Sequence, residues 1–266
     1  MNRTAAGSFL TVLLSNNLHE VHGYNRAAAV ARGDVLILLQ DDILPPADCR
    51  WLTDVLARFD AFPRLGAVGL NIAETWMPPA VHEKAGGTGG SSRRVGGAGI
   101  LFRHQGMPFQ FVTVADYSPF AVRASALAVV GGMDEGMAAP GECGILADYD
   151  LCMRLWMAGW QVAHAALRNS FRVSGVGGTH RSPSVGAKCW GKQLHLNNRA
   201  LSKRFSPADT AVVFDQLREL NSQLEAAFEG EPPWVRCCGG DKGPPHRGAC
   251  DPCGTVHGGF VNVPPV

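Results

Sequence analysis

The stretch Val35-Leu-Ile-Leu-Leu-Gln-Asp-Asp42 places two adjacent carboxylates directly after a run of apolar residues. A short, fully apolar run predicts a strand that is buried on both faces, as in parallel sheets covered by helices. In open α/β sheets, ligands bind beyond the carboxyl ends of the strands. Two like charges this close are stable only beside a cation, a strong hydrogen-bond donor or water. Asp41 and Asp42 are therefore candidates for a binding site.

Two interpretations of this acidic pair remain open from the strand alone. The carboxylates could hold a divalent cation, Mg²⁺ or Mn²⁺, that binds the phosphates of a substrate, because such hard cations prefer oxygen ligands. Alternatively, Asp41 and Asp42 simply begin a loop or cap the following turn, where aspartate is common.

The segments around this stretch alternate between strand and helix signals. Apolar runs predict strands over residues 9–14, 35–39 and 65–70, and helical spacing predicts helices over residues 25–32 and 50–62. A βαβαβ order of this kind indicates an α/β fold in which a mostly parallel sheet is flanked by helices.

The later part of the chain continues with weaker signals and ends in a tail rich in cysteine, glycine and proline. Glycine and serine over residues 86–99 predict a mobile loop. Further patterns predict a strand-like stretch over 109–114, helices over 120–130, 148–157 and 207–228, and a strand over 161–166. We expect a main domain over residues 1–205, an amphipathic helix within 206–230, and a poorly ordered tail over 231–266.

Composition narrows the class of protein. Hydrophobic residues make up 46% of the 266 residues, enough for a sizeable core, so the chain as a whole is not intrinsically disordered. The formal net charge of +1 gives no overall field that would attract nucleic acid. No apolar run approaches the length of a membrane span, and the first residues lack the cleavage site of a signal peptide. Localisation, whether cytoplasmic or Golgi-associated, stays open.

The eight cysteines fall into two groups. The scattered group looks like small buried hydrophobic residues. The group in the tail allows a structural Zn²⁺ site, disulfides or no order at all, because only one of its two pairs has the CxxC spacing of a zinc site. The scattered group is Cys49, Cys143, Cys152 and Cys189, and the tail group is Cys237, Cys238, Cys250 and Cys253.

Two further segments carry side chains that could do chemistry. Asp148 and Asp150 stand where a helix is expected to begin, so one could cap the helix while the other acts as a general base; a purely structural role for both fits the local sequence better. The glycine-rich stretch 175–182 carries His180 and Arg181, which could bind an anion or a metal, or could lie on the surface without such a role.

Together, four segments resemble the family 2 glycosyltransferases, enzymes of the GT-A fold that use nucleotide sugars. Each segment is loose by itself, but the four follow the order and the approximate spacing of that family between residue 9 and about residue 204. They are Gly23-Tyr-Asn-Arg-Ala-Ala-Ala-Val-Ala-Arg-Gly-Asp34, Val35-Leu-Ile-Leu-Leu-Gln-Asp-Asp42, Val130-Gly-Gly-Met-Asp-Glu135 and Asp148-Tyr-Asp-Leu-Cys-Met-Arg-Leu-Trp-Met-Ala-Gly-Trp160.

The resemblance implies a metal-assisted, inverting transfer of a sugar from a nucleotide-sugar donor to a hydroxyl of a glycan, lipid or protein acceptor. It implies that Asp148 is the catalytic base, and that Asp42 and His180 bind Mn²⁺ or Mg²⁺. The donor side would consist of Asn25, Arg26, Gln40 and Asp41, and the acceptor side of Gly131, Gly132, Asp134, Glu135 and Asp150.

The chain departs from the family pattern at three points. Gln40 stands at the first position of the Asp-x-Asp motif, and Ala147 stands where a glutamate usually precedes the catalytic acid. Family members also begin with a strand, a helix and a second strand that have no counterpart here, so we expect an N-terminally truncated domain. These departures leave an alternative: a non-catalytic GT-A remnant that acts as a binding or scaffold module.

Overall fold

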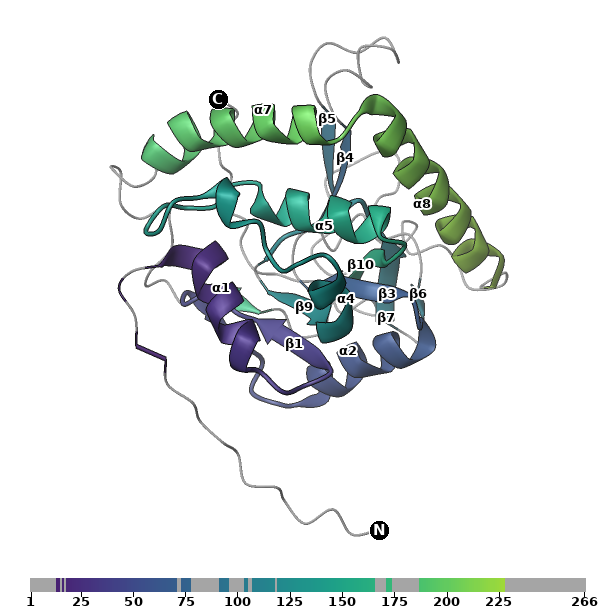
Figure 1. Cartoon of the computed structure of the whole chain (residues 1–266). Helices are drawn as coiled ribbons and strands as arrows, with labels where there is room; N and C mark the ends of the chain where they lie inside the picture. Colours follow the sequence, from purple (N-terminus) through teal and green to yellow (C-terminus); the bar gives the residue numbers. More distant parts are fainter. Residues whose placement is uncertain are drawn as a thin grey trace, which may run out of the picture.

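The computed structural model describes residues 13–14, 16, 18–70, 73–77, 91–95, 103–104, 107–117, 119–165, 171–173 and 187–227. Its main sheet contains five strands, and a two-residue strand extends one edge (Figure 1). In spatial order the strands are β1 (Val35–Leu38), β9 (Phe120–Arg123), β3 (Leu65–Gly69), β10 (Gln161–Ala165), β7 (Met107–Phe111) and the short β6 (Arg103–His104).

The prediction of a mostly parallel sheet is wrong. Only β3 and β10 pair in parallel, whereas the other neighbours in this sheet pair antiparallel. β9 causes the difference, because it lies between β1 and β3 and runs against both. The predicted helix over residues 120–130 therefore begins with a strand, and only Ala124–Val129 (α4) is helical. The helix-favouring alanines of α4 conceal the preceding buried apolar strand in the sequence pattern.

Helices cover the sheet and close a single hydrophobic core. α2 (Arg50–Ala61) packs on β3, α4 packs on β9, and α5 (Ala147–Met157) packs on β10. Their apolar side chains belong to one cluster of buried residues with the strands, as helical spacing predicts for elements that face a sheet. α1 (His19–Val30) precedes β1 and begins six residues before the predicted start.

The C-terminal helices belong to the same body. A π-helical segment called η3 (Ala187–Gln193) leads into α7 (Leu194–Arg204), and the long α8 (Pro207–Ala227) follows. The amide of Asn221 on α8 binds the backbone of Phe111 on β7: its Oδ1 accepts from the N–H at 2.9 Å, and its Nδ2 donates to the carbonyl at 3.0 Å. The predicted amphipathic helix is thus confirmed, and its apolar stripe shares the main core.

Two further predictions, a loop over residues 86–99 and a buried strand over residues 9–14, differ from the structure. A three-stranded sheet has the order β5 (Ser91–Val95), β4 (Ala73–Met77), β8 (Val114–Ala115), and β2 (Ile43–Leu44) pairs with β11 (Arg172–Val173). β5 lies inside the range predicted as a loop, because pairing with β4 supplies the backbone partners that the local sequence does not reveal. Leu13 and Leu14, predicted to end a buried strand, are 49% and 92% exposed. Residues 9–12 lie outside the described part.

The scattered cysteines are not all buried hydrophobic residues. Cys143 and Cys189 form a disulfide with a Cα–Cα distance of 5.8 Å. Cys152 is buried with a free thiol, as predicted, whereas Cys49 is exposed. The disulfide joins the segment before α5 to η3, which are 46 residues apart in sequence. Among the described helices, none has the length and apolar character needed to cross a membrane.

Candidate functional site

The acidic pair follows β1 in a tight turn. The N–H of Ile43 donates to the carbonyl of Gln40 at 3.1 Å, which reverses the chain between β1 and β2. Asp41 is exposed and Asp42 is half-buried, so both carboxylates reach the surface at the carboxyl end of the strand. The turn interpretation and the binding interpretation of the pair are therefore compatible.

A third carboxylate, which the sequence pattern did not single out, completes this acidic end. Glu20, in the first turn of α1, accepts a hydrogen bond from the side-chain amide of Gln40. Burial raises the pKa of the Glu20 carboxyl, and the nearby charges of Asp42 and Asp41 raise it further, against the opposing effect of the Gln40 hydrogen bond. Glu20 thus places a third carboxylate beside Gln40, next to Asp41 and Asp42.

Two tyrosine rings connect the acidic end of β1 with the start of α5. Tyr24 on α1 and Tyr117 pack edge to face with their ring centroids 5.9 Å apart. Burial raises the pKa of the Tyr24 hydroxyl, and the charges of Glu20, Asp116, Asp41 and Asp42 act in the same direction. The acidic end of β1 is therefore close to one side of this ring pair.

The other side of the ring pair is close to Asp148. The hydroxyl of Tyr117 donates to the carbonyl of Ala147 at 2.9 Å, directly before Asp148 in the first turn of α5. Burial raises the pKa of the Tyr117 hydroxyl well above its usual value, and the charge of Asp148 adds to this effect. The packed rings of Tyr24 and Tyr117 thus lie between the acidic end of β1 and Asp148.

The expectation that Asp148 or Asp150 caps α5 is wrong. Leu146 occupies the N-cap position in a left-handed conformation, with φ of 68°, and makes no side-chain cap. Asp148 is half-buried, and its Oδ1 accepts from the N–H of Tyr149 at 3.0 Å. Asp148 therefore stands at the beginning of the helix without serving as its cap.

Asp150 lies in an internal network of charges. Its side chain is fully buried, and Arg154 Nε donates to its Oδ2 at 2.6 Å, while Arg204 binds its Oδ1. Arg204 also bridges to Asp134 at 2.5 Å. Although burial alone would raise the pKa of Asp134, hydrogen bonds from Arg204 and from the N–H of Gly136 hold it below its usual value. The carboxylates of Asp134 and Asp150 are thus bound by arginines within the protein.

Asn25 fastens α1 to the turn after α4. Its Oδ1 accepts from the N–H of Met133 at 2.9 Å, and its Nδ2 donates to the Met133 carbonyl and to Glu135 at 2.9 and 3.0 Å. His22 adds an ion pair to Glu135 at 3.0 Å. The hydrogen bond from Asn25 and the charge of His22 lower the pKa of Glu135. Residues predicted for the donor and acceptor sides are therefore joined here, whereas Arg26 is exposed on α1.

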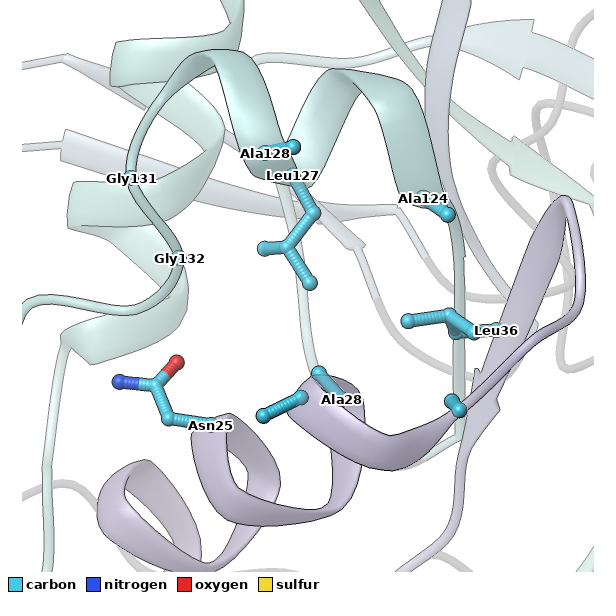
Figure 2. Close-up of a pocket in the computed structure, with 10 residues that line it drawn as sticks. Asn25, Ala28, Leu36, Ala124, Leu127, Ala128, Gly131 and Gly132 are labelled. Carbon is cyan, nitrogen blue, oxygen red and sulfur yellow. The ribbon is translucent and has the colours of Figure 1, made fainter.

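An apolar hollow of about 380 Å³ lies between α1, β1 and α4 (Figure 2). Leu36 from β1 and Leu127 from α4 point into it, and Asn25 stands at its end near Gly132. None of the carboxylates named above lines this hollow. It is therefore separate from the acidic end of β1.

The described residues do not form a complete site for a divalent cation. Among them, no group of three or more histidine, cysteine, aspartate or glutamate side chains is arranged to hold a metal. His180 and the tail cysteines, which carry the other predicted metal contacts, lie outside the described residues.

Comparison of the chain with known protein families and with curated proteins gives no match. No relative therefore supplies a function for these residues.

The hydrogen bonds between Asn25 and the backbone of Met133 restrict the turn after α4, and two glycine substitutions test this restriction. Gly131 and Gly132 both have positive φ, of 76° and 80°, so alanine at either costs about 1 kcal/mol of conformational energy. At Gly132, however, a Cβ would approach Asn25 Oδ1 to 2.9 Å, whereas at Gly131 it would meet nothing within 4 Å. We expect Gly132→Ala to lower the free energy of unfolding more than Gly131→Ala, as measured by urea titration. Equal losses of unfolding free energy in the two variants would show that the Asn25 hydrogen bonds do not restrict this turn.

Proposed function

We propose that this chain is a glycosyltransferase-like domain that transfers a sugar from a nucleotide-sugar donor to an acceptor hydroxyl with inversion. Asp148 acts as the general base in this proposal, and Asp41 and Asp42 lie on the donor side. The acceptor is a glycan, a lipid or a protein.

One observation supports the proposal: the packed rings of Tyr24 and Tyr117 lie between the acidic end of β1 and Asp148. Burial raises the pKa of both hydroxyls, and the charges of the carboxylates near each ring add to this effect. Inverting transfer requires groups that act from two directions, because the leaving diphosphate and the attacking hydroxyl must be on opposite sides of one anomeric carbon.

The reaction can be written with the chain's own groups. Asp148 accepts the proton of the acceptor hydroxyl while the hydroxyl oxygen forms a bond to the anomeric carbon. The bond from that carbon to the nucleoside diphosphate breaks, and the leaving group keeps the electron pair. A positioned base of this kind accelerates a reaction by about 10²- to 10⁴-fold. A divalent cation, proposed as cofactor, would offset charge on the leaving diphosphate.

A second candidate is a non-catalytic module that keeps the sheet but has lost donor binding. One observation favours this alternative: several residues that the family resemblance assigns to ligand binding are bound instead by other residues of the protein. The amide of Asn25 is occupied by the turn after α4, and both oxygens of Asp150 are bound by arginines. The Gln40 amide is likewise bound to Glu20.

Titration calorimetry with common nucleoside diphosphates, with and without Mn²⁺, separates the two candidates. We expect Mn²⁺-dependent binding by the wild-type chain and its loss in Asp42→Asn, since that change removes a charged oxygen ligand at the end of β1. Asp60→Asn, an exposed aspartate on α2, is the control and should bind as the wild type does. If no nucleoside diphosphate binds in the presence of Mn²⁺, the non-catalytic candidate replaces the proposal.

A further inference from the structure

The segment formed by η3 and α7 carries positive charge without any compensating acid of its own. Residues 187–204 contain no aspartate or glutamate. The same residues contain several cationic side chains: Lys188, Lys192, Arg199, Lys203 and Arg204, together with His195. This separation of charge contrasts with the balanced composition of the whole chain, whose net charge is +1.

Helical spacing separates the segment into a buried side and a basic side. The side that faces the protein consists of Cys189, Gln193, Asn197 and Leu201, all of them buried. The opposite side, which we call the basic face, consists of exposed residues at intervals of three and four: Lys192, His195, Arg199 and Lys203. Over this stretch the basic face is about 16 Å long.

Several contacts fix the basic face in place. The disulfide between Cys143 and Cys189 anchors η3. Asn197 Nδ2 donates to the carbonyls of Met137 and Ile145 at 2.9 and 2.6 Å, which anchors α7. The charges therefore project from a scaffold held against the body of the protein, and little order has to be gained when they bind a partner.

The charges of the basic face are available to an outside partner. Lys188, next to the face, forms an ion pair with Glu142 at 3.2 Å, and Arg204 is bound by Asp134 and Asp150. Within the described part of the chain, by contrast, the cations of the basic face form no ion pair; only Lys192 is near an acid, Glu142, whose pKa is lowered first by Lys188 and also by the charge of Lys192. Figure 1 shows α7 at the periphery of the molecule.

An exposed apolar side chain accompanies these charges. Leu196 on α7 is 45% exposed, and it lies four residues after Lys192 and three before Arg199, on the same side of the segment. A basic helix with an apolar neighbour is typical of a membrane-surface contact.

We propose that the basic face docks on an anionic membrane surface. Lipid headgroups supply a plane of negative charge for the lysines and the arginine, and the headgroup boundary accommodates the apolar side chain of Leu196. Nucleic acid fits less well, because its phosphate backbone offers nothing to this aliphatic group. Binding is peripheral and reversible, since a few surface cations alone give only modest affinity.

Vesicle sedimentation tests this docking without any nucleotide or acceptor. The full chain is expected to bind phosphatidylcholine vesicles that contain phosphatidylserine, and to bind pure phosphatidylcholine vesicles much more weakly. The triple variant Lys192→Gln/Arg199→Gln/Lys203→Gln should bind the anionic vesicles about 100-fold more weakly, because each cation contributes about fivefold to such affinity. A triple variant of exposed cations on other helices and loops, Arg32→Gln/Arg50→Gln/Arg218→Gln, should bind as the wild type does.

Two results would overturn the proposal. The first is equal vesicle binding by the two triple variants. The second is binding to a single- or double-stranded oligonucleotide that is lost in the Lys192→Gln/Arg199→Gln/Lys203→Gln variant, with no binding to anionic vesicles. Leu196→Ser separates the apolar contribution, and we expect it to weaken vesicle binding severalfold while leaving thermal unfolding unchanged. Nucleotide binding and sugar transfer do not enter these measurements, so they are independent of the proposed function.

Discussion

Asp148→Asn should lower the rate of sugar transfer by about 10²- to 10⁴-fold, the usual contribution of a positioned general base. Asparagine cannot accept the proton of the acceptor hydroxyl at neutral pH, so the nucleophile is not activated. Nucleotide binding should be unchanged, because the carboxylates proposed for the donor side, Asp41 and Asp42, are near Tyr24, whereas Asp148 is near Tyr117. The loss should therefore appear in kcat, whereas the affinity for the nucleoside diphosphate stays at its wild-type value.

The fold should tolerate this substitution. Asp148 is half-buried, and its Oδ1 accepts from the N–H of Tyr149 at 3.0 Å. The carbonyl oxygen of asparagine can accept the same hydrogen bond. A loss of activity would then come from the missing base and not from unfolding, which circular dichroism and thermal unfolding can verify.

A matched control is Asp215→Asn, which neutralises an exposed aspartate on α8 that forms an ion pair with the exposed Arg218. This control should transfer sugar at the wild-type rate. Full transfer activity in Asp148→Asn would contradict the assignment of the base.

The sequence pattern predicted well those elements that have a clear apolar period of their own. The helix α2, the strands β1, β3 and β10 and the helix α5 all begin and end within about two residues of the predicted limits. Each combines a clear apolar period with a proline, glycine or charged boundary. Local periodicity therefore carries enough information for such elements.

The order of the strands could not be predicted in the same way. β9 is a short apolar strand joined directly to the alanine-rich α4, so its pattern merges with that of the helix. Its insertion between β1 and β3 depends on long-range pairing, with Leu36 opposite Val122 and Val68 opposite Ala121. Periodicity within a segment says nothing about which neighbour it pairs with.

The same limit applies to the candidate site. The acidic pair and Asp148 stand out in the sequence because they follow a strand and begin a helix. Glu20 does not stand out, since its contact with Gln40 joins α1 to the end of β1. The disulfide between Cys143 and Cys189 and the contact between Asp150 and Arg204 join residues even farther apart in sequence. Contacts of this kind are visible only once the chain is folded.

Asp150→Asn should lower the free energy of unfolding by about 3–5 kcal/mol, the cost of removing one partner from a buried ion pair. The Asp150 side chain is fully buried and binds two arginines, Arg154 through Oδ2 and Arg204 through Oδ1. Neutralising it leaves both guanidinium groups without their central counter-ion. Asparagine keeps the size of the side chain, so the loss would reflect charge and hydrogen bonding rather than a cavity.

The matched control is Asp134→Asn, which removes the other carboxylate bound to Arg204. Asp134 is 26% exposed, so water can solvate the groups left behind, and we expect a loss of about 1 kcal/mol or less. Urea unfolding at neutral pH measures both variants, and the double variant Asp150→Asn/Arg204→Gln measures the coupling between the partners. If Asp150→Asn is no more destabilising than Asp134→Asn, the buried network is not what stabilises this region.

The consequences of Asp150→Asn should extend beyond global stability. Arg154, held by Asp150, donates through Nη1 to the carbonyls of Val130 and Gly132 at 2.6 and 2.8 Å. Arg204, the other partner, ends α7. Loss of Asp150 should therefore increase hydrogen exchange in the turn after α4 and at the C-terminal end of α7, even in conditions where the protein stays folded.

Because Asp150 is internal, this variant should affect sugar transfer only through disorder in the turn, and stabilisation by low temperature should restore part of the activity. Asp148→Asn should show no such recovery, since cooling cannot supply a missing base.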